Sequence, residues 1–184
     1  MSKKIAVYCG SKTGSESAFG KAAQALGEEL ATNKIDLVYG GAQVGLMGIV
    51  ADASLQKQGN VIGVIPDKLY EMEVAHLALS KLHRVESMHE RKALMADLSD
   101  AFIALPGGIG TLEEILEMMT WAQIGYHQKP CALLNVAGYY NSLINFLREM
   151  ETKGFAYRPI DEALIIEEDP KKLLERIFQY WTEE

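Results

Sequence analysis

The stretch AFIALPGGIGTLEE, Ala101 to Glu114, holds the change of pattern that decides the fold. A continuously apolar run ends at a proline and two glycines, and a threonine and two glutamates then open a helical pattern. Strands that are apolar throughout are typical of parallel sheets covered by helices on both faces. The first amides of a helix lack partners within the helix, so a glycine-rich turn in front of them can receive an anion. The stretch therefore predicts a strand–turn–helix unit, whose turn is either an anion site with carboxylates beside it or only the start of a well-capped helix.

Short apolar runs alternate with longer helical patterns along the rest of the chain. The expected strands are 4–9, 36–40, 61–66, 81–85, 101–106, 131–136 and 163–168. The expected helices are 15–32, 45–57, 88–99, 111–125, 139–153 and 170–181. Residues 67–80 fit neither pattern and are interpreted as a partly helical excursion. This order predicts an α/β protein with a Rossmann-like doubly wound parallel sheet and helices on both faces.

The composition narrows the class of protein further. A chain of 184 residues with 48% hydrophobic residues can bury a sizeable core, and we expect residues 1–184 to form one domain. The formal net charge of -7 argues against nucleic-acid polymers and anionic membranes as partners. The apolar run at the start is too short for a signal peptide and no run is long enough to span a bilayer, which predicts a cytoplasmic protein. Cys9 and Cys131 lack metal-ligand spacing, and each is expected to be a buried thiol.

A glycine-rich loop, YGGAQVGLMG (39–48), follows the second predicted strand. In open α/β sheets, ligands bind outside the carboxyl ends of the strands, where this loop is expected to lie. Its glycines are Gly40, Gly41, Gly45 and Gly48. The loop matches neither the Walker motif nor the G-x-G-x-x-G dinucleotide motif. Glycine permits a close approach of backbone and ligand, but a tight turn with close helix packing explains the same residues. The loop CGSKTGS (9–15) after the first strand gives a weaker signal.

Two of the predicted helices begin with a capping-box pattern. Ser87 stands three residues before Glu90, and Thr111 stands three residues before Glu114. In a capping box, the first side chain accepts a bond from an early helical amide and the glutamate reaches back. A cap is therefore the simplest explanation of Glu114, and attraction to the helix dipole is the simplest explanation of Glu113. Neither explains why glycine-rich loops gather at the same edge of the sheet.

Arg91 falls on the apolar stripe of the helix expected at 88–99, between Met88 and Met95. A guanidinium on the core side of a helix is unfavourable unless it meets an anion. Arg91 is therefore a candidate anion ligand. Pairing with a structural carboxylate, or reaching solvent from the helix start, is the alternative. The neighbouring Lys92 is most simply a solvated charge.

Four segments resemble those of a known family: GGAQVGLMG, SMHERKALM, PGGIGTLEE and WAQIGYHQKPCALLN. With these segments in this order, the chain resembles the LONELY GUY family over nearly its whole length. Members of that family are cytokinin riboside 5'-monophosphate phosphoribohydrolases, long mislabelled as lysine decarboxylases. The resemblance implies a homodimer with a Rossmann-like fold that splits an adenosine-type 5'-monophosphate into a free base and ribose 5-phosphate. It implies no metal and no redox cofactor.

The resemblance also implies roles for individual residues. Arg91 and Glu114 match the catalytic pair of the family. The phosphate and ribose loop of the family matches Gly107, Gly108, Ile109, Gly110, Thr111, Leu112 and Glu113. Further substrate contacts are expected at Glu73, Lys92, Met88, Gly40, Gly41 and Gly45. Ile109 stands where plant members often carry an aromatic residue, so the resemblance leaves the substituent on the base open.

The implied chemistry suits these residue types. Breaking a ribosyl–base bond passes through a state with positive charge on the sugar, as in glycoside hydrolysis. A carboxylate such as Glu114 can stabilise that charge and orient a water molecule. Backbone amides at 107–111 would hold the 5'-phosphate, while Arg91 would contact either the phosphate or the departing base.

Two other functions stay open at the level of the sequence. The first is a carrier that binds a nucleotide or cofactor on the same fold without catalysis. The second is an amino-acid decarboxylase, which normally needs pyridoxal phosphate bound to a lysine. No lysine of this chain has a recognisable setting for such a bond, and the four histidines lack metal-ligand spacing. Release of adenine from AMP would separate the hydrolase from the carrier.

Overall fold

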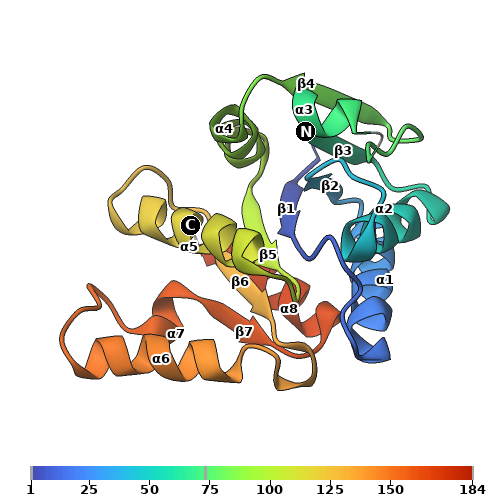
Figure 1. Cartoon of the computed structure of the whole chain (residues 1–184). Coiled ribbons are helices and arrows are strands. Elements are labelled where there is room, and N and C mark those ends of the chain that lie inside the picture. Colours follow the sequence, from blue (N-terminus) through green and yellow to red (C-terminus); the bar gives the residue numbers. More distant parts are fainter. Residues whose placement is uncertain (1, 73, 184) are drawn as a thin grey trace.

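The computed structural model describes residues 2–72 and 74–183, and in this part of the chain seven strands form one sheet (Figure 1). The strands are β1 (Lys4–Tyr8), β2 (Asp36–Tyr39), β3 (Val61–Pro66), β4 (Lys81–Val85), β5 (Ala101–Ala104), β6 (Cys131–Leu134) and β7 (Ile165–Glu167). The helices are α1 (Ser17–Thr32), α2 (Gly45–Gln56), α3 (Asp67–Glu71), α4 (Met88–Leu98), α5 (Ile109–Gln123), α6 (Asn141–Thr152), α7 (Ile160–Ala163) and α8 (Pro170–Glu183), with a 3-10 helix η1 (Val136–Gly138). Strands and helices alternate as the sequence predicts.

Neighbouring strands of the sheet run parallel, in the order β4-β3-β2-β1-β5-β6-β7. From β1 the chain first extends the sheet in one direction to β4. It then crosses back and builds β5, β6 and β7 on the other side. The predicted Rossmann-like doubly wound sheet is therefore confirmed. The reversal lies between β1 and β5, where Tyr8 is paired with Ala104, and ligands of such folds bind at the carboxyl ends of the two strands that flank it.

Helices cover both faces of the sheet and bury two apolar layers (Figure 1). α1, α2 and α8 contribute to the first layer, and α4, α5 and α6 contribute to the second. The side chains of β1 contribute to both layers, because successive residues of a strand point to opposite faces of the sheet. Ile5 and Val7 join the first layer, and Ala6 and Tyr8 join the second. None of the helices that the structure describes combines the length and the apolar character needed to cross a membrane.

The partly helical character expected for 67–80 is confirmed, because α3 occupies its start and the other described residues are mostly loop. The elements depart from the predicted ones in a few places. The short helix α7, just before β7, was not predicted. Most important for the site, α5 begins at Ile109 rather than at 111. The predicted burial of the thiols is confirmed, since Cys9 and Cys131 are both buried and free.

Candidate functional site

The floor of the candidate site is formed where the loops after β1 and β5 touch. Gly10 N donates to Pro106 O over 3.1 Å, and Gly10 O accepts from Leu46 N, at the start of α2, over 3.0 Å. A Cβ added to Gly107 would lie 2.9 Å from Gly10 N and 2.7 Å from the Cβ of Thr111. No side chain fits at position 107, so glycine there is required by close packing.

The N-terminus of α5 opens onto this floor without a cap from a side chain. Gly108 is the N-cap residue, and glycine has no side chain with which to cap the helix. Open space surrounds the Cβ positions of Gly108 and Gly110. The prediction that Thr111 caps a helix beginning at 111 is wrong, because the helix starts two residues earlier and Thr111 is buried in its first turn. The first amides of α5 are thus available to an anion.

The start of α4 is fixed by the predicted cap. Ser87 Oγ accepts from Glu90 N over 3.1 Å, which confirms the first half of the capping box. The Glu90 carboxylate reaches back one residue further than the motif implies and accepts from Glu86 N over 2.8 Å. Since the helix start is held in this way, Arg91 leaves its first turn at a defined angle.

Arg91 and Glu114 meet inside the site, one from α4 and the other from α5. Both residues are 8% exposed, and Arg91 Nη2 lies 3.5 Å from Glu114 Oε1. A Cβ on Gly40 would lie 3.0 Å from Arg91 Cζ, so the glycine after β2 makes room for the guanidinium. Arg91 Nε is buried and has no hydrogen-bond partner among the described residues. The expected inward orientation of Arg91 is confirmed, and its guanidinium retains an unused donor.

Glu114 is an unusual carboxylate because it is buried. Burial raises the pKa of Glu114 above the ordinary value, and the charge of Arg91 opposes this rise. A group whose pKa is shifted by burial and by one specific charge is typical of functional sites. Glu114 is therefore a carboxylate whose protonation depends on its contact with Arg91.

Lys92, the neighbour of Arg91, has a different environment. It is 7% exposed, forms an ion pair with Glu113, and its Nζ donates to Glu117 Oε1 over 3.2 Å. The interpretation of Lys92 as a solvated charge is wrong. Burial lowers the pKa of Lys92, but the two carboxylates outweigh that effect and the net direction is upward. Lys92 connects α4 to α5.

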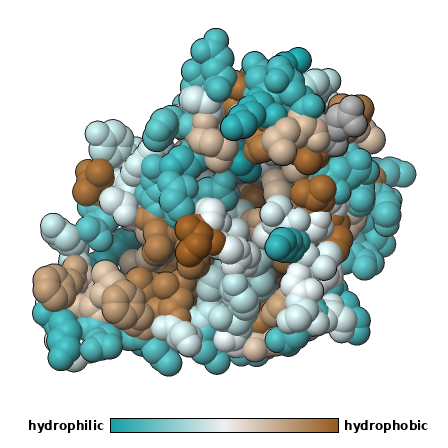
Figure 2. Space-filling model, in the orientation of Figure 1, coloured by the Kyte–Doolittle hydropathy of each residue, from teal (hydrophilic) through white to brown (hydrophobic). Residues whose placement is uncertain are grey.

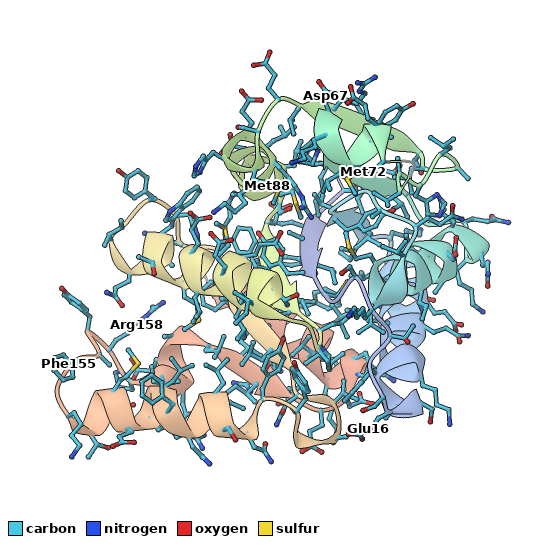
Figure 3. The ribbon with its side chains drawn as sticks, in the orientation of Figure 1. Glu16, Asp67, Met72, Met88, Phe155 and Arg158 are labelled. Atoms are coloured by element: carbon cyan, nitrogen blue, oxygen red, sulfur yellow. The ribbon has the colours of Figure 1, made fainter. Side chains whose placement is uncertain are left out.

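A cavity of about 570 Å³ lies between these elements. Its polar lining includes Ser11, Lys12, Arg91, Thr111, Glu113 and Glu114. Its apolar lining includes Ala42, Val44, Met47, Leu69, Val74 and Met88. Figure 3 shows Met88 projecting from the start of α4 toward the segment after α3 that carries Met72. The size falls within the range of about 300–1,000 Å³ that is usual for small-molecule sites.

One wall of the cavity is fastened to the glycine-rich loop after β2. Val74 O accepts from Gln43 N and Gly41 O accepts from His76 N, each over 2.8 Å. The buried His76 also contacts Asp52 on α2, with 2.9 Å between Nε2 and Oδ1. These bonds hold the segment after α3 against α2, so Val74 is held in place in the cavity wall.

The structure brings most of the expected site residues to this cavity, but not all of them. Those that line it are Gly40, Met88, Arg91, Gly108, Gly110, Thr111, Glu113 and Glu114. Those that do not line it are Gly41, Gly45, Lys92, Gly107, Ile109 and Leu112. Glu73 lies outside the described residues. Ile109 is 83% exposed, whereas Leu112 packs into the second apolar layer.

The loop after β1 is the part of the site that sequence reasoning undervalued. Gly10, Ser11 and Lys12 line the cavity, although their segment gave only a weak motif. They also border a second cavity of about 430 Å³, together with Phe19 and Tyr139. The signal that could have found them is position, because this loop follows the strand at which the order of the sheet reverses.

Solved structures with a similar fold include molybdenum cofactor proteins. The Moco carrier protein of Chlamydomonas reinhardtii superposes with a TM-score of 0.76 at 20% identity, covering 100% of both chains. The molybdenum cofactor binding protein of Rippkaea orientalis gives 0.74 at 23% identity, covering 97% of each chain. At such identities the likeness shows the fold, and it carries no statement about the ligand of this chain.

Sequence relatives are much closer. A family model described as "Possible lysine decarboxylase" matches residues 47–177. Cytokinin riboside 5'-monophosphate phosphoribohydrolase LOG3 of Arabidopsis thaliana is 47% identical over 178 residues, which cover 97% of this chain and 83% of that protein. A cytokinin riboside 5'-monophosphate phosphoribohydrolase of Rhodococcoides fascians is 49% identical over 154 residues, which cover 83% of this chain and 78% of that protein. With such identity over nearly its whole length, the chain belongs to the LONELY GUY family of cytokinin riboside 5'-monophosphate phosphoribohydrolases.

Proposed function

We propose that this chain hydrolyses the N-glycosidic bond of adenosine-type riboside 5'-monophosphates, AMP or its N6-modified forms, and releases the free base and ribose 5-phosphate. The observation that carries the proposal is the buried pair of Arg91 and Glu114, 3.5 Å apart, in a cavity that also contains the start of α5. Relatives at 47–49% identity bear the name of this activity. The same name gives the hydrolase precedence over the decarboxylase and the carrier.

The phosphate end of the substrate is assigned to α5. The first amides of this helix are uncapped and carry the positive end of the helix dipole. Gly108 and Gly110 leave space in which a phosphate can approach those amides. Anchoring the phosphate there would fix the ribose, so binding energy from a group that does not react would position the carbon that does.

Glu114 is assigned to the reacting carbon. As the glycosidic bond breaks, positive charge develops on the ribose, and an ionised carboxylate in a site shielded from water stabilises that charge. The same carboxylate can orient a water molecule for attack on the sugar. The charge of Arg91 favours the ionised form of Glu114 and so opposes the effect of burial, and its free Nε is available to the bound nucleotide.

Incubation with AMP and with N6-isopentenyl-AMP tests the proposal. We expect free adenine or free N6-isopentenyladenine, measured by chromatography, together with ribose 5-phosphate. Adenosine should react far more slowly, because it lacks the anchoring phosphate. A protein that binds AMP and returns it unchanged would be a carrier.

The proposal extends to assembly and location. We infer a single-domain chain that forms a homodimer in the cytoplasm and takes neither nucleic-acid polymers nor membranes as partners. Support for the dimer comes from exposed apolar side chains, which gather as brown surface on the face that carries α5 and α6 (Figure 2). Exposed large apolar side chains in this part of the chain include Ile109, Ile124 and Phe155. Light scattering of the purified protein would give the mass of the assembly directly, and a monomer would contradict the inference.

A further inference from the structure

The loop after β1 carries a lysine, Lys12, that the mechanism above does not use. The backbone of this loop is held on both sides, since Gly10 N donates to Pro106 O and Gly10 O accepts from Leu46 N. Gly45 has a φ of +57° and packs so closely against the backbone of Lys12 that no side chain would fit between them. The backbone position from which the Lys12 side chain extends is therefore fixed.

Lys12 lies on a wall shared by two cavities. The candidate site and the second cavity, of about 570 and 430 Å³, both include Gly10, Ser11, Lys12 and Gly108 in their linings. Gly108 is also the N-cap residue of α5. A flexible, exposed cation and the first amides of a helix therefore border the same space.

The other two cations near this space are already matched by carboxylates. Arg91 pairs with Glu114, and Lys92 forms ion pairs with two further glutamates of α5. For Lys12, no ion pair exists within residues 2–72 and 74–183. A phosphate monoester brings about 1.5 to 2 negative charges at neutral pH, next to Glu113 and Glu114. In a chain with a net charge of -7, a cation that is not already neutralised would strengthen the binding of such a ligand.

We propose that Lys12 binds the 5'-phosphate of the substrate, together with the first amides of α5, and thereby selects phosphorylated over unphosphorylated nucleosides. This assignment rests on the proposed function of the site. A lysine ammonium is a compact charge on a flexible stem and can follow a phosphate without demanding one geometry. In the proposed mechanism the rigid amides of α5 orient the phosphate, whereas the flexible ammonium of Lys12 adds charge without fixing that orientation. The Lys12 contact is therefore expected to be equal in the ground state and the transition state, so that it lowers KM rather than raising kcat.

Binding of ribose 5-phosphate, the product in the proposed reaction, tests Lys12 without turnover. Lys12→Gln should raise the Kd for ribose 5-phosphate about tenfold, as measured by titration calorimetry. Lys12→Arg keeps the charge and should stay within about threefold of the unmodified protein. The control is Lys171→Gln, on the exposed side of α8, which removes the same charge outside both cavities. It should leave the Kd unchanged if the effect is local rather than a result of net charge.

Kinetics with AMP supply the second measurement. Lys12→Gln should raise KM about tenfold and leave kcat within about twofold. Equal Kd and KM for Lys12→Gln and the unmodified protein would overturn the role of Lys12 and leave the hydrolase proposal standing. A different result would separate the two proposals. If Lys12→Gln loses ribose 5-phosphate binding but the unmodified protein releases no adenine from AMP, the phosphate role of Lys12 would stand and the hydrolase proposal would be overturned.

Discussion

Arg91 and Lys92 are adjacent in the chain, and both are buried cations that pair with glutamates of α5. Arg91 borders the cavity, makes one loose ion pair, and has a free Nε. Lys92 lies outside the cavity lining and contacts two carboxylates. A step of one residue turns a helix by about 100°, which is enough to give the two cations different surroundings. The comparison separates a pair that is open to a ligand from a cluster that joins two helices.

The largest expected effect comes from removing the negative charge of Glu114, the partner of Arg91 in the cavity. Glu114→Gln keeps the shape of the side chain but cannot stabilise positive charge on the ribose. We expect kcat for AMP to fall at least about a hundredfold, or ~2.7 kcal/mol. The measurement is the rate of adenine release, with the melting temperature and AMP binding as controls for folding. Normal hydrolysis by this variant would show that Glu114 is structural.

Arg91→Lys tests whether the cavity-side cation needs its planar shape. Lysine keeps the charge but loses the fork of donors and the free Nε. Activity should fall at least about tenfold, or ~1.4 kcal/mol, while the protein stays folded. Steady-state kinetics with AMP and a thermal melt would measure both quantities. Unchanged turnover would make Arg91 no more functional than Lys92.

Lys92→Met tests the other side of the comparison through stability. The change leaves Glu113 and Glu117 without their shared cation. Glu113 is half exposed, whereas Glu117 is mostly buried and its Oε2 is shielded from solvent. We expect a loss of about 1–2 kcal/mol in the free energy of unfolding. The matched control is Lys3→Met, which breaks an exposed pair with Asp100 and should cost less than about 1 kcal/mol. Denaturant titration measures the loss in the free energy of unfolding for both variants. Equal losses would show that the Lys92 cluster stabilises the fold no more than an exposed ion pair does.

The smallest expected effect is on the pH dependence of activity. Burial raises the pKa of Glu114, with Arg91 opposing, and the reaction needs the ionised form. The rate should therefore fall as pH drops through this raised pKa, reaching about half its maximum at the pKa itself. The charge of Lys92 also lowers the pKa of Glu114, so Lys92→Met should move the acid limb to higher pH. A limb at the pH of an ordinary exposed carboxylate would contradict the role of burial.

The sheet and its ligand-binding edge could be predicted because they depend on patterns that are local in the chain. Continuous apolar runs identified β1, β5 and β6, and the alternation with helices identified the doubly wound order. The orientation of Arg91 followed from its place on an apolar stripe. Each of these inferences used the period of a single element, which the sequence displays directly.

Contacts between elements could not be predicted in the same way. Whether Thr111 caps a helix depends on where the chain leaves the floor formed with Gly10, and that contact joins residues far apart in sequence. The burial of Lys92 depends on two glutamates one helix away. The position of Lys12 beside the start of α5 depends on the pairing of β1 with β5. Helix boundaries and ion-pair partners are decided by tertiary packing rather than by propensity.

The pairing of β1 with β5 also makes the site a late product of folding. Ile5 is paired with Ala101, so the two loops that form the floor meet only after a segment of nearly a hundred residues has been enclosed. Contacts of such long sequence separation form slowly because the chain must first lose the entropy of closing the loop. During synthesis, a nascent chain that does not yet include α5 would contain the loop after β1 but no anion site. Recovery of adenine release during refolding would therefore report the completion of the sheet, and it should lag behind the recovery of helical circular dichroism.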